Sequence, residues 1–377
     1  MADLNIESVD KNLAVSSKID APDVELHDVR KAPFQIYGLY NPLAEPVFKR
    51  LPTEVAEKTS NGVLSLHTHT AGGRVRFSTD SPYIVIKAVM SKVTHFSHMP
   101  LTGTSGFDLY IDAPDGSTSA YHRTFVPPFD MTDGYESKVI VNRPGKHCFT
   151  IHFPLYNRLT ALYVGVAKGS VLEQGAPYRD LLPIVIYGNS VTQGGCASRP
   201  GNAYSNMVTR ALGIDHINLG FSGSGCGEQA IADYMAGLKM SAFVSDYDHN
   251  ALTPEDLQKT HYNLYRTIRA QHPHIPYIMI SRTDFYFDNL YIGGEENSII
   301  RRRIILNSYQ AAIDAGDRNV YFLDGERVFT GSYGDCCTVD GGHPNDLGFM
   351  LYAEQISDIL RRCLREGKLC KKENNYG

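Results

Sequence analysis

The second half of the sequence alternates short apolar runs with stretches of helical spacing, and this alternation restricts the fold more than any other feature. Five runs rich in Val, Ile, Leu and Phe, each followed by a helical stretch, occupy residues 183–188, 216–223, 241–246, 276–281 and 319–325. Alternating strands and helices are typical of a parallel sheet with helices on both faces. The sequence therefore predicts an α/β domain over residues 176–377.

The first half has a different pattern. Residues 33–168 hold short runs rich in Val, Ile, Tyr, Phe and Thr, separated by Gly, Pro and Asp, with no convincing helical stretch. Such spacing predicts a β-sandwich, which we place at residues 33–175 after an N-terminal extension of residues 1–32. A chain of 377 residues is too long for one ordinary domain, which agrees with two.

Composition limits the partners and the location. A net charge of −5 without a basic block argues against nucleic acid or an anionic membrane surface as partner. The polar, acidic N-terminus and the lack of a long apolar window predict neither a secretion signal nor a membrane anchor. The seven cysteines are odd in number and lack CxxC spacing, which favours reduced thiols in the cytoplasm. We therefore expect a cytoplasmic protein with a small-molecule partner, and leave a homo-oligomer open.

The chemistry should lie where the apolar runs end, because ligands of open α/β sheets bind beyond the carboxyl ends of the strands. A serine hydroxyl there needs a base within hydrogen-bond reach, and the base needs an orienting partner. Ser190, His343 and Asp340 can fill these three roles. Asp324, at the end of the last run, is the alternative to Asp340.

A tetrahedral intermediate on this serine would need hydrogen-bond donors for its oxyanion. The candidates are the backbone N–H groups of Ser190 and Gly223 and the side-chain amide of Asn250. The loop around Asn250, DYDHN, could instead be a solvated loop or a metal cluster.

Four segments carry a resemblance to a known family. GNSVTQG, NLGFSG, DYDHN and DGGHPND resemble, in order, the four sequence blocks of the SGNH or GDSL-like hydrolases, over about residues 180–365. GFDLY at 106–110 resembles the signature of the β-sandwich domain that precedes the hydrolase domain in one branch of that family, and GGCASRPG resembles the same branch. Two departures are Asn189, where the family usually has aspartate, and the third block, which lacks the Gly-x-Asn-Asp form.

The resemblance implies a flavodoxin-like three-layer hydrolase domain behind a jelly-roll-like sandwich, and a mechanism without metal or organic cofactor. It implies Ser190 as nucleophile, His343 as base and Asp340 as its acid. The candidate substrate-binding residues are Asn189, Arg199, His98 and Asp248. His98 would come from a sandwich loop that reaches the site, and Arg199 could instead pair with a surface acid.

These features predict a serine esterase that works through an acyl-enzyme. A sandwich beside an SGNH-like domain resembles carbohydrate deacetylases, so acetyl esters on sugars or oligosaccharides are the expected substrates. The lack of Trp favours a small substrate over a polysaccharide. The alternatives are a short-chain acyl or aryl esterase or thioesterase without sugar preference, and a carbohydrate-binding protein whose hydrolase half is inert.

Overall fold

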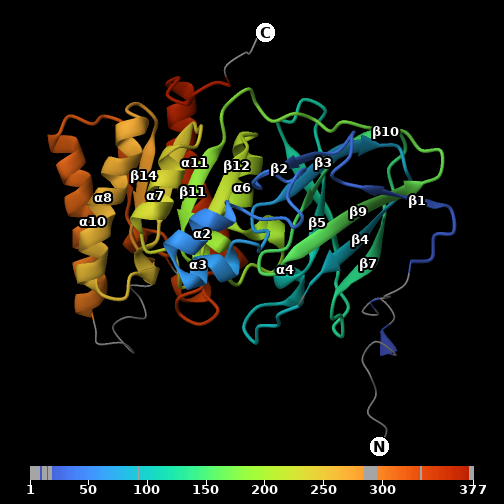
Figure 1. Ribbon diagram of the computed structural model, residues 1–377, viewed down its shortest axis with the longest axis horizontal. Helices are drawn as coiled ribbons and strands as arrows, with labels where there is room; N and C mark the ends of the chain where they lie inside the picture. The colour runs from blue at the N-terminus through green and yellow to red at the C-terminus, as the bar shows by residue number, and fades with distance from the viewer. Residues whose placement is uncertain are drawn as a thin grey trace, which may run out of the picture.

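The computed structural model describes residues 9–10, 15, 19–91, 93–283, 295–331 and 333–372. Two antiparallel sheets come from the first part of the chain and one parallel sheet from the second (Figure 1). The strands are β1 (Val24–Asp28), β2 (Gln35–Tyr37), β3 (Arg74–Thr79), β4 (Tyr83–Met90), β5 (Phe107–Asp112), β6 (Ser119–Phe125), β7 (Gly134–Ile140), β8 (His147–His152), β9 (Leu159–Ala167), β10 (Leu172–Glu173), β11 (Ile184–Gly188), β12 (His216–Gly220), β13 (Ala242–Asp246), β14 (Tyr277–Ile280) and β15 (Val320–Leu323). The α-helices are α2 (Thr53–Thr59), α3 (Asn61–Leu66), α4 (Leu101–Thr104), α5 (Ser190–Gln193), α6 (Tyr204–Leu212), α7 (Gln229–Ala236), α8 (Pro254–Gln271), α10 (Glu295–Asp314) and α11 (Asp346–Arg365).

The first part of the chain forms the predicted β-sandwich. One sheet has the order β1-β9-β4-β7, and the other has the order β10-β3-β8-β5-β6 with β2 on β3. Aromatic and β-branched side chains from both sheets fill one core, among them Val75, Phe77, Ile84, Ile86, Phe149, Ile151 and Val164. Strand β1 lies within the predicted N-terminal extension and pairs with β9. The boundaries at residues 33 and 176 stay a prediction.

Two short helices, α2 and α3, interrupt this strand-rich part, and the sequence analysis did not predict them. They lie beside α7, against the parallel sheet rather than inside the sandwich (Figure 1). Ser60 caps α3 by accepting a hydrogen bond from the N–H of Val63, at 3.2 Å. Each helix buries a single side chain, Ala56 in α2 and Val63 in α3. Helices this short cannot show the repeated apolar spacing by which a helix is recognised in a sequence.

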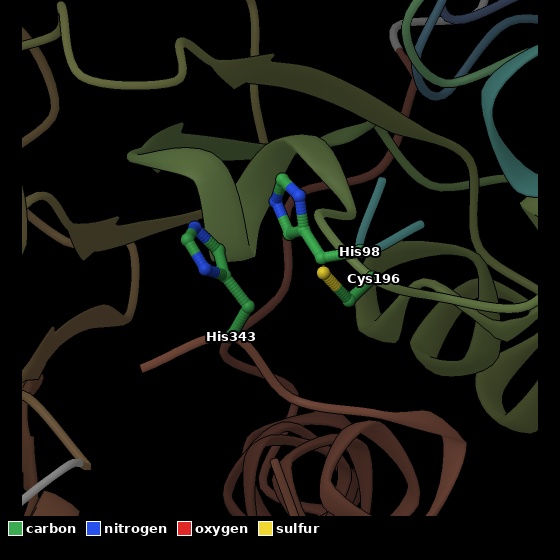
Figure 2. A group of neighbouring side chains, drawn as sticks. All are labelled: His98, Cys196 and His343. Atoms are coloured by element: carbon green, nitrogen blue, oxygen red, sulfur yellow. The ribbon is translucent and has the colours of Figure 1, made fainter. Parts of the chain in front are cut away.

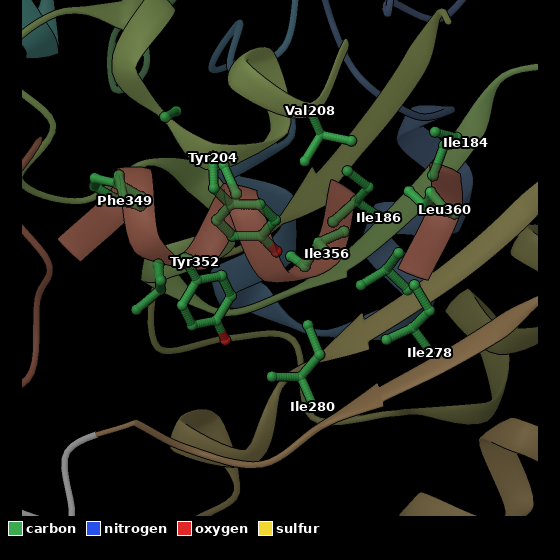
Figure 3. Packing of buried hydrophobic residues seen from close by; sticks show 14 of the residues in the cluster. Ile184, Ile186, Tyr204, Val208, Ile278, Ile280, Phe349, Tyr352, Ile356 and Leu360 are labelled. Atoms are coloured by element: carbon green, nitrogen blue, oxygen red, sulfur yellow. The ribbon is translucent and has the colours of Figure 1, made fainter. Parts of the chain in front are cut away.

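The second part forms the predicted parallel sheet, in the order β12-β11-β13-β14-β15. Numbered along the domain this order is 2-1-3-4-5, which is the flavodoxin-like arrangement. Helices α6 and α11 pack on one face, where Ile184 and Ile186 of β11 meet Val208 and Ile356 (Figure 3). The intervening Val185 belongs to the core on the other face, with side chains of α7, α8 and α10. Both predicted layers of helices are thus present.

Strand β11 pairs with β12 on one side and with β13 on the other, so three strand ends meet at one edge of the sheet. Gly188 lies opposite Gly220 of β12 and Asp246 of β13. A Cβ atom at Gly188 would overlap with the carbonyl oxygen of Asp246 and with Oγ1 of Thr192. Glycine is therefore required where the chain leaves the sheet toward Ser190.

The seven cysteines are all free, and they include the buried Cys196, Cys337 and Cys363. Among the helices in the described part of the chain, none combines the length and the apolar character needed to cross a membrane. The location of the chain stays a prediction.

Candidate active site

Ser190 is the first residue of α5, two positions after the end of β11. Asn189 caps this helix, because its Oδ1 accepts hydrogen bonds from the N–H of Val191 (2.7 Å) and of Thr192 (3.3 Å). The Asn189 side chain is fully buried, and we find no hydrogen-bond partner for its Nδ2 among the described residues. That it binds substrate stays a prediction. The N–H of Ser190 is the first in the helix and has no acceptor inside it. The cap thus leaves this N–H beside the serine hydroxyl.

Ser190, His343 and Asp340 lie together at the carboxyl edge of the sheet. Ser190 Oγ lies 2.9 Å from His343 Nε2, and His343 Nδ1 lies 2.8 Å from Asp340 Oδ2. Asp340 Oδ1 also accepts hydrogen bonds from the backbone N–H of His343 (2.8 Å) and of Gly342 (3.1 Å). The carboxylate therefore fixes both the backbone and the ring of the histidine.

The charge on Asp340 determines the tautomer of His343. Partial burial would raise the pKa of Asp340, but hydrogen bonds from the backbone and the ring of His343, together with the charge of that ring, lower it overall. The carboxylate is thus ionised and can only accept, so Nδ1 of His343 carries the proton. Nε2 is then left to accept a hydrogen bond from the hydroxyl of Ser190.

Asp324, the alternative acid, points elsewhere. Its two oxygens accept hydrogen bonds from Arg302 Nε (2.7 Å) and Nη2 (2.5 Å) in α10. It therefore serves as the ion-pair partner of a helix on the sheet, and Asp340 is the carboxylate in contact with His343.

The loop that contains Gly223 is held next to Ser190 by two amide side chains. Gln193 Oε1 accepts a hydrogen bond from Ser222 N–H (3.0 Å), and Gln193 Nε2 donates to Leu155 O (3.1 Å) in the first part of the chain. Gly223 has a φ of 63°, in the left-handed region that favours glycine. Within the described residues, we find no acceptor for the N–H of Gly223 or of Ser190.

Asn250 is the second of these amides, and its placement differs from the expectation. Its Nδ2 donates to the carbonyl oxygens of Phe221 (2.8 Å) and Gly225 (3.0 Å). Both amide hydrogens are therefore used to hold the loop around Gly223. A flipped amide would set its oxygen against two carbonyl oxygens, so the assignment of the nitrogen follows from chemistry.

Asp248 and Arg199 both form ion pairs within the protein, and that they bind substrate stays a prediction for each. Asp248 is buried, accepts a hydrogen bond from Arg282 N–H (3.0 Å) and pairs with Arg301 (3.4 Å). Arg199 pairs with Asp108 of the GFDLY segment at 2.9 Å. The alternative for Arg199, pairing with an acid, is what we observe, although this acid is buried rather than on the surface. Sequence proximity to the strand ends did not distinguish these roles.

Side chains from the first part of the chain reach the site, among them His98 and Tyr156, whose hydroxyl donates to Ser190 O (3.4 Å). His98 is exposed, lies in the loop between β4 and α4, and has its ring centroid 5.7 Å from that of His343. Cys196 lies close to both rings (Figure 2). Burial, followed by the charge of Asp340, raises the pKa of Cys196 to about 12, so the thiol is protonated at neutral pH. Met99 is part of the core instead.

Asp346 is a site-related residue that the sequence analysis missed. Its oxygens accept hydrogen bonds from the N–H and hydroxyl of Ser198 (2.9 and 2.5 Å) and from the amide of Asn202 (2.8 Å). It thereby joins the start of α11, three residues after His343, to the turn that follows α5. Its place in the last block, DGGHPND, is a signal that could have identified it.

Asp246 is a buried carboxyl group behind the serine. Thr192 Oγ1 (3.1 Å) and the hydroxyl of Tyr204 (3.2 Å) donate to it. Burial raises its pKa to about 7, against the lowering effect of the hydroxyl groups of Tyr352, Thr192 and Tyr204. We found no His, Cys, Asp or Glu group suited to a metal ion in the DYDHN loop, within the part of the chain that the structure describes.

Comparisons with protein families match both parts of the chain. Residues 182–361 match the GDSL-like lipase/acylhydrolase family, and residues 24–172 match the GxDLY family, the N-terminus of SGNH hydrolase-type esterases. A search of curated protein sequences gave no significant match.

Solved structures resemble the whole chain. A GDSL-like lipase from Bacteroides ovatus is 28% identical, with a TM-score of 0.80 over 93% of this chain and 99% of that one. The salicylyl-acyltransferase SsfX3 of a tetracycline biosynthetic pathway is 20% identical, with a TM-score of 0.73 over 93% of this chain and 100% of its own. A family two carbohydrate esterase from Clostridium thermocellum is 12% identical, with a TM-score of 0.59 over 89% and 99%. At such identities the last two show the fold alone.

Proposed function

We propose that this chain, a carboxylic ester hydrolase that matches the GDSL-like lipase/acylhydrolase family and the GxDLY N-terminal domain of SGNH hydrolase-type esterases, hydrolyses small acyl esters on sugars or oligosaccharides. Acetyl esters are the foremost proposed substrates. Ser190, His343 and Asp340 are the proposed catalytic residues. The proposed steps use no metal and no organic cofactor.

The observation that carries the proposal is the series of two hydrogen bonds from Ser190 through His343 to Asp340, at 2.9 and 2.8 Å. A serine hydroxyl is a weak nucleophile at neutral pH unless a base accepts its proton. A neutral imidazole held by a carboxylate provides that base, because the charge of the carboxylate stabilises the imidazolium that forms.

The proposed reaction has two halves. Ser190 Oγ attacks the ester carbonyl carbon while His343 Nε2 takes the hydroxyl proton, and the tetrahedral intermediate then expels the alcohol, which receives that proton. Water then attacks the acyl-enzyme while His343 takes a proton from it, which gives a second tetrahedral intermediate. When this intermediate collapses, the acid is released and His343 returns the proton to Ser190. Asp340 keeps the imidazole in the reactive tautomer throughout.

The proposed oxyanion donors are the N–H groups of Ser190 and Gly223. Each lost donor of this kind typically costs about 100-fold to 1000-fold in rate. Asn250, which we expected among these donors, supports them in this proposal by holding the loop of Gly223 through Phe221 and Gly225. It is therefore a positioning residue.

Two observations support the sugar preference: the fold shared with carbohydrate esterases, and the position of His98. The family two carbohydrate esterases share the fold, and one of them was solved in complex with cellohexaose. An acetyl xylan esterase from Butyrivibrio proteoclasticus also shares it, at 11% identity and a TM-score of 0.56. In this chain, the exposed His98 reaches the edge of the site from the sandwich and is placed to contact the alcohol part of an ester.

The first alternative is a short-chain acyl or aryl esterase or thioesterase without sugar preference. The second, a carbohydrate-binding protein with an inert hydrolase half, is disfavoured because the serine, histidine and aspartate lie within hydrogen-bond reach of one another. An inert half would have no need of that geometry.

Hydrolysis of p-nitrophenyl acetate, longer p-nitrophenyl esters and acetylated mono- and oligosaccharides tests the proposal. We expect a preference for acetyl and for the sugar esters, and a loss of at least about 1000-fold in kcat for Ser190→Ala. Ser117→Ala, at an exposed turn of the sandwich, is the matched control. Equal rates on sugar and aryl acetates would favour the first alternative. Absence of hydrolysis by the wild type, or full activity of Ser190→Ala, would contradict the proposal.

A further inference from the structure

Three side chains from separate segments present metal-ligating atoms to one point beside Ser190. They are His98 from the sandwich loop, Cys196 from the turn after α5, and His343 from the loop before α11 (Figure 2). One ligating atom from each lies within 4.8 Å of the other two. Among the described residues, this is the one such group of His, Cys, Asp and Glu that we found.

His343 is held in the form that metal ions bind. A metal-bound histidine commonly donates its second ring N–H to a carboxylate, which orients the ring and raises its basicity. His343 Nδ1 donates to Asp340 at 2.8 Å, so Nε2 carries the lone pair, which faces Ser190 Oγ at 2.9 Å and which a metal ion could take instead. The Cδ2 edge of this ring, next to Nε2, faces Gly195, because a Cβ built on Gly195 would lie 3.2 Å from Cδ2. The available nitrogen is thus on the side of Cys196.

Cys196 and His98 complete the set from two sides. Cys196 is buried to 3% exposure, with a φ of 76°, in a turn closed by the hydrogen bond from Ala197 N–H to Gly194 O (3.1 Å). The turn therefore fixes the sulfur in the floor of the site. His98 is exposed, and we find no hydrogen-bond partner for its ring among the described residues. Its side chain can turn without losing a hydrogen bond.

We propose that His98, Cys196 and His343 form a reversible inhibitory site for zinc or a similar borderline-soft divalent ion. Two imidazole nitrogens and one sulfur suit zinc and exclude magnesium and calcium, which prefer oxygen. Tetrahedral zinc bonds of about 2.0–2.3 Å set the ligand atoms about 3.3–3.7 Å apart, so closure requires a shift of about 1 Å, which the His98 side chain can make. On binding, the thiol of Cys196 releases its proton to solvent, and water or Ser190 Oγ takes the fourth position.

The inhibition follows from competition for one lone pair. The ion takes Nε2 of His343, which can then no longer accept the proton of Ser190. This consequence rests on the proposed function, in which His343 is the base. The binding itself does not depend on it.

The test combines calorimetric zinc titration of the chelator-treated protein with p-nitrophenyl acetate hydrolysis. We expect one zinc per chain, a loss of more than 10-fold in rate that a chelator reverses, and no effect of magnesium. Cys196→Ser, with its rate expressed relative to its own metal-free rate, should need at least about 10-fold more zinc for half-inhibition. Cys336→Ser, which removes an exposed thiol outside the group, should respond as the wild type does. Equal inhibition of Cys196→Ser and wild type would overturn the proposal.

Cobalt(II) provides a readout that needs neither activity nor a variant's stability. Bound through Cys196, it should give a sulfur-to-cobalt charge-transfer band in the near ultraviolet that zinc displaces, and that Cys196→Ser lacks. A wild type that shows this band but hydrolyses no ester would contradict the proposed function and leave the site standing. A wild type that hydrolyses esters without the band or zinc inhibition would overturn the site alone.

Discussion

Asp108 of β5 and Arg199, in the turn that follows α5, form an ion pair of 2.9 Å between the sandwich and the parallel-sheet part of the chain. Asp108 is fully buried and also accepts a hydrogen bond from Gly201 N–H at 2.8 Å. Tyr110 accepts a second hydrogen bond from Arg199, at 2.5 Å. Side chains alternate along a strand, so Asp108 and Tyr110 face the turn while Phe107 enters the sandwich core. The GFDLY segment therefore fastens the sandwich to the chain that follows Ser190.

Asp108→Asn should weaken this attachment. It removes the charge that offsets Arg199 and leaves a buried amide, at a cost of about 2–3 kcal/mol in the free energy of unfolding. Burial raises the pKa of Asp108, and the charge of Arg199 opposes that rise, so the pair stabilises the ionised form. Urea unfolding measures the change, with Asp115→Asn at an exposed turn as control. Equal midpoints for Asp108→Asn and wild type would show that the pair contributes nothing.

Asp346→Ala should lower turnover without loss of substrate affinity. The carboxylate joins the start of α11 to Ser198 and Asn202, and displacement of a reacting group by about 1 Å can cost about 100-fold in rate. We expect a fall of about 10-fold to 100-fold in kcat with little change in KM. Asp358→Ala removes an exposed carboxylate of the same helix and should leave kcat unchanged. A rise in KM with an unchanged kcat would argue against a positioning role.

The sequence was enough to predict the sheet and the proximity of Ser190, His343 and Asp340, because the strands of such an α/β domain are parallel and their carboxyl ends lie at one edge. Asp340 could be favoured over Asp324 because three residues separate it from His343, so one turn can hold both. These inferences depend on local spacing and on a recurrent topology.

The partners of Arg199, Asp248 and Asn189 could not be predicted in the same way. Each stands near a strand end, where polar residues suggest substrate contact, yet each makes hydrogen bonds within the protein. Arg199 meets an acid 91 positions away in the chain. Only the docking of the two parts decides which polar side chains are buried, and periodicity carries no information about that docking.

Asp340→Asn and Asp324→Asn should have opposite outcomes. An amide at 340 can donate to Nδ1 of His343 and so favour the wrong tautomer, and we expect kcat to fall by about 1000-fold to 10,000-fold. Asp324→Asn weakens the pair with Arg302 and should change kcat by less than about threefold. Steady-state kinetics of both variants decide between the two acids. A larger loss in the 324 variant would reverse the assignment.

Asp246→Asn should remove a pH dependence of stability. The folded-state pKa is raised from 3.8 to about 7, so between these values the native state holds a proton that the unfolded state has lost. The free energy of unfolding of the wild type therefore falls as pH rises, by about 1.4 kcal/mol per pH unit from this group. The variant lacks this pH-dependent contribution, so its free energy of unfolding relative to that of the wild type should be greater at pH 7.5 than at pH 5. Urea unfolding at both pH values measures the difference, and a pH-independent difference would contradict it.

Two variants of Asn250 distinguish a positioning role for its side chain from direct contact with the oxyanion. Asn250→Ala removes two hydrogen bonds to the buried loop carbonyls of Phe221 and Gly225, so we expect losses both in turnover and, by about 1–3 kcal/mol, in the free energy of unfolding. Asn250→Asp has nearly the same shape but sets carboxylate oxygens against those two carbonyl oxygens, and it should destabilise the protein more than alanine does. Thermal unfolding and kcat of the two variants test this, with Asn263→Ala on the exposed side of α8 as control. If both variants lose turnover while their unfolding midpoints stay at the wild-type value, the amide contacts the oxyanion directly.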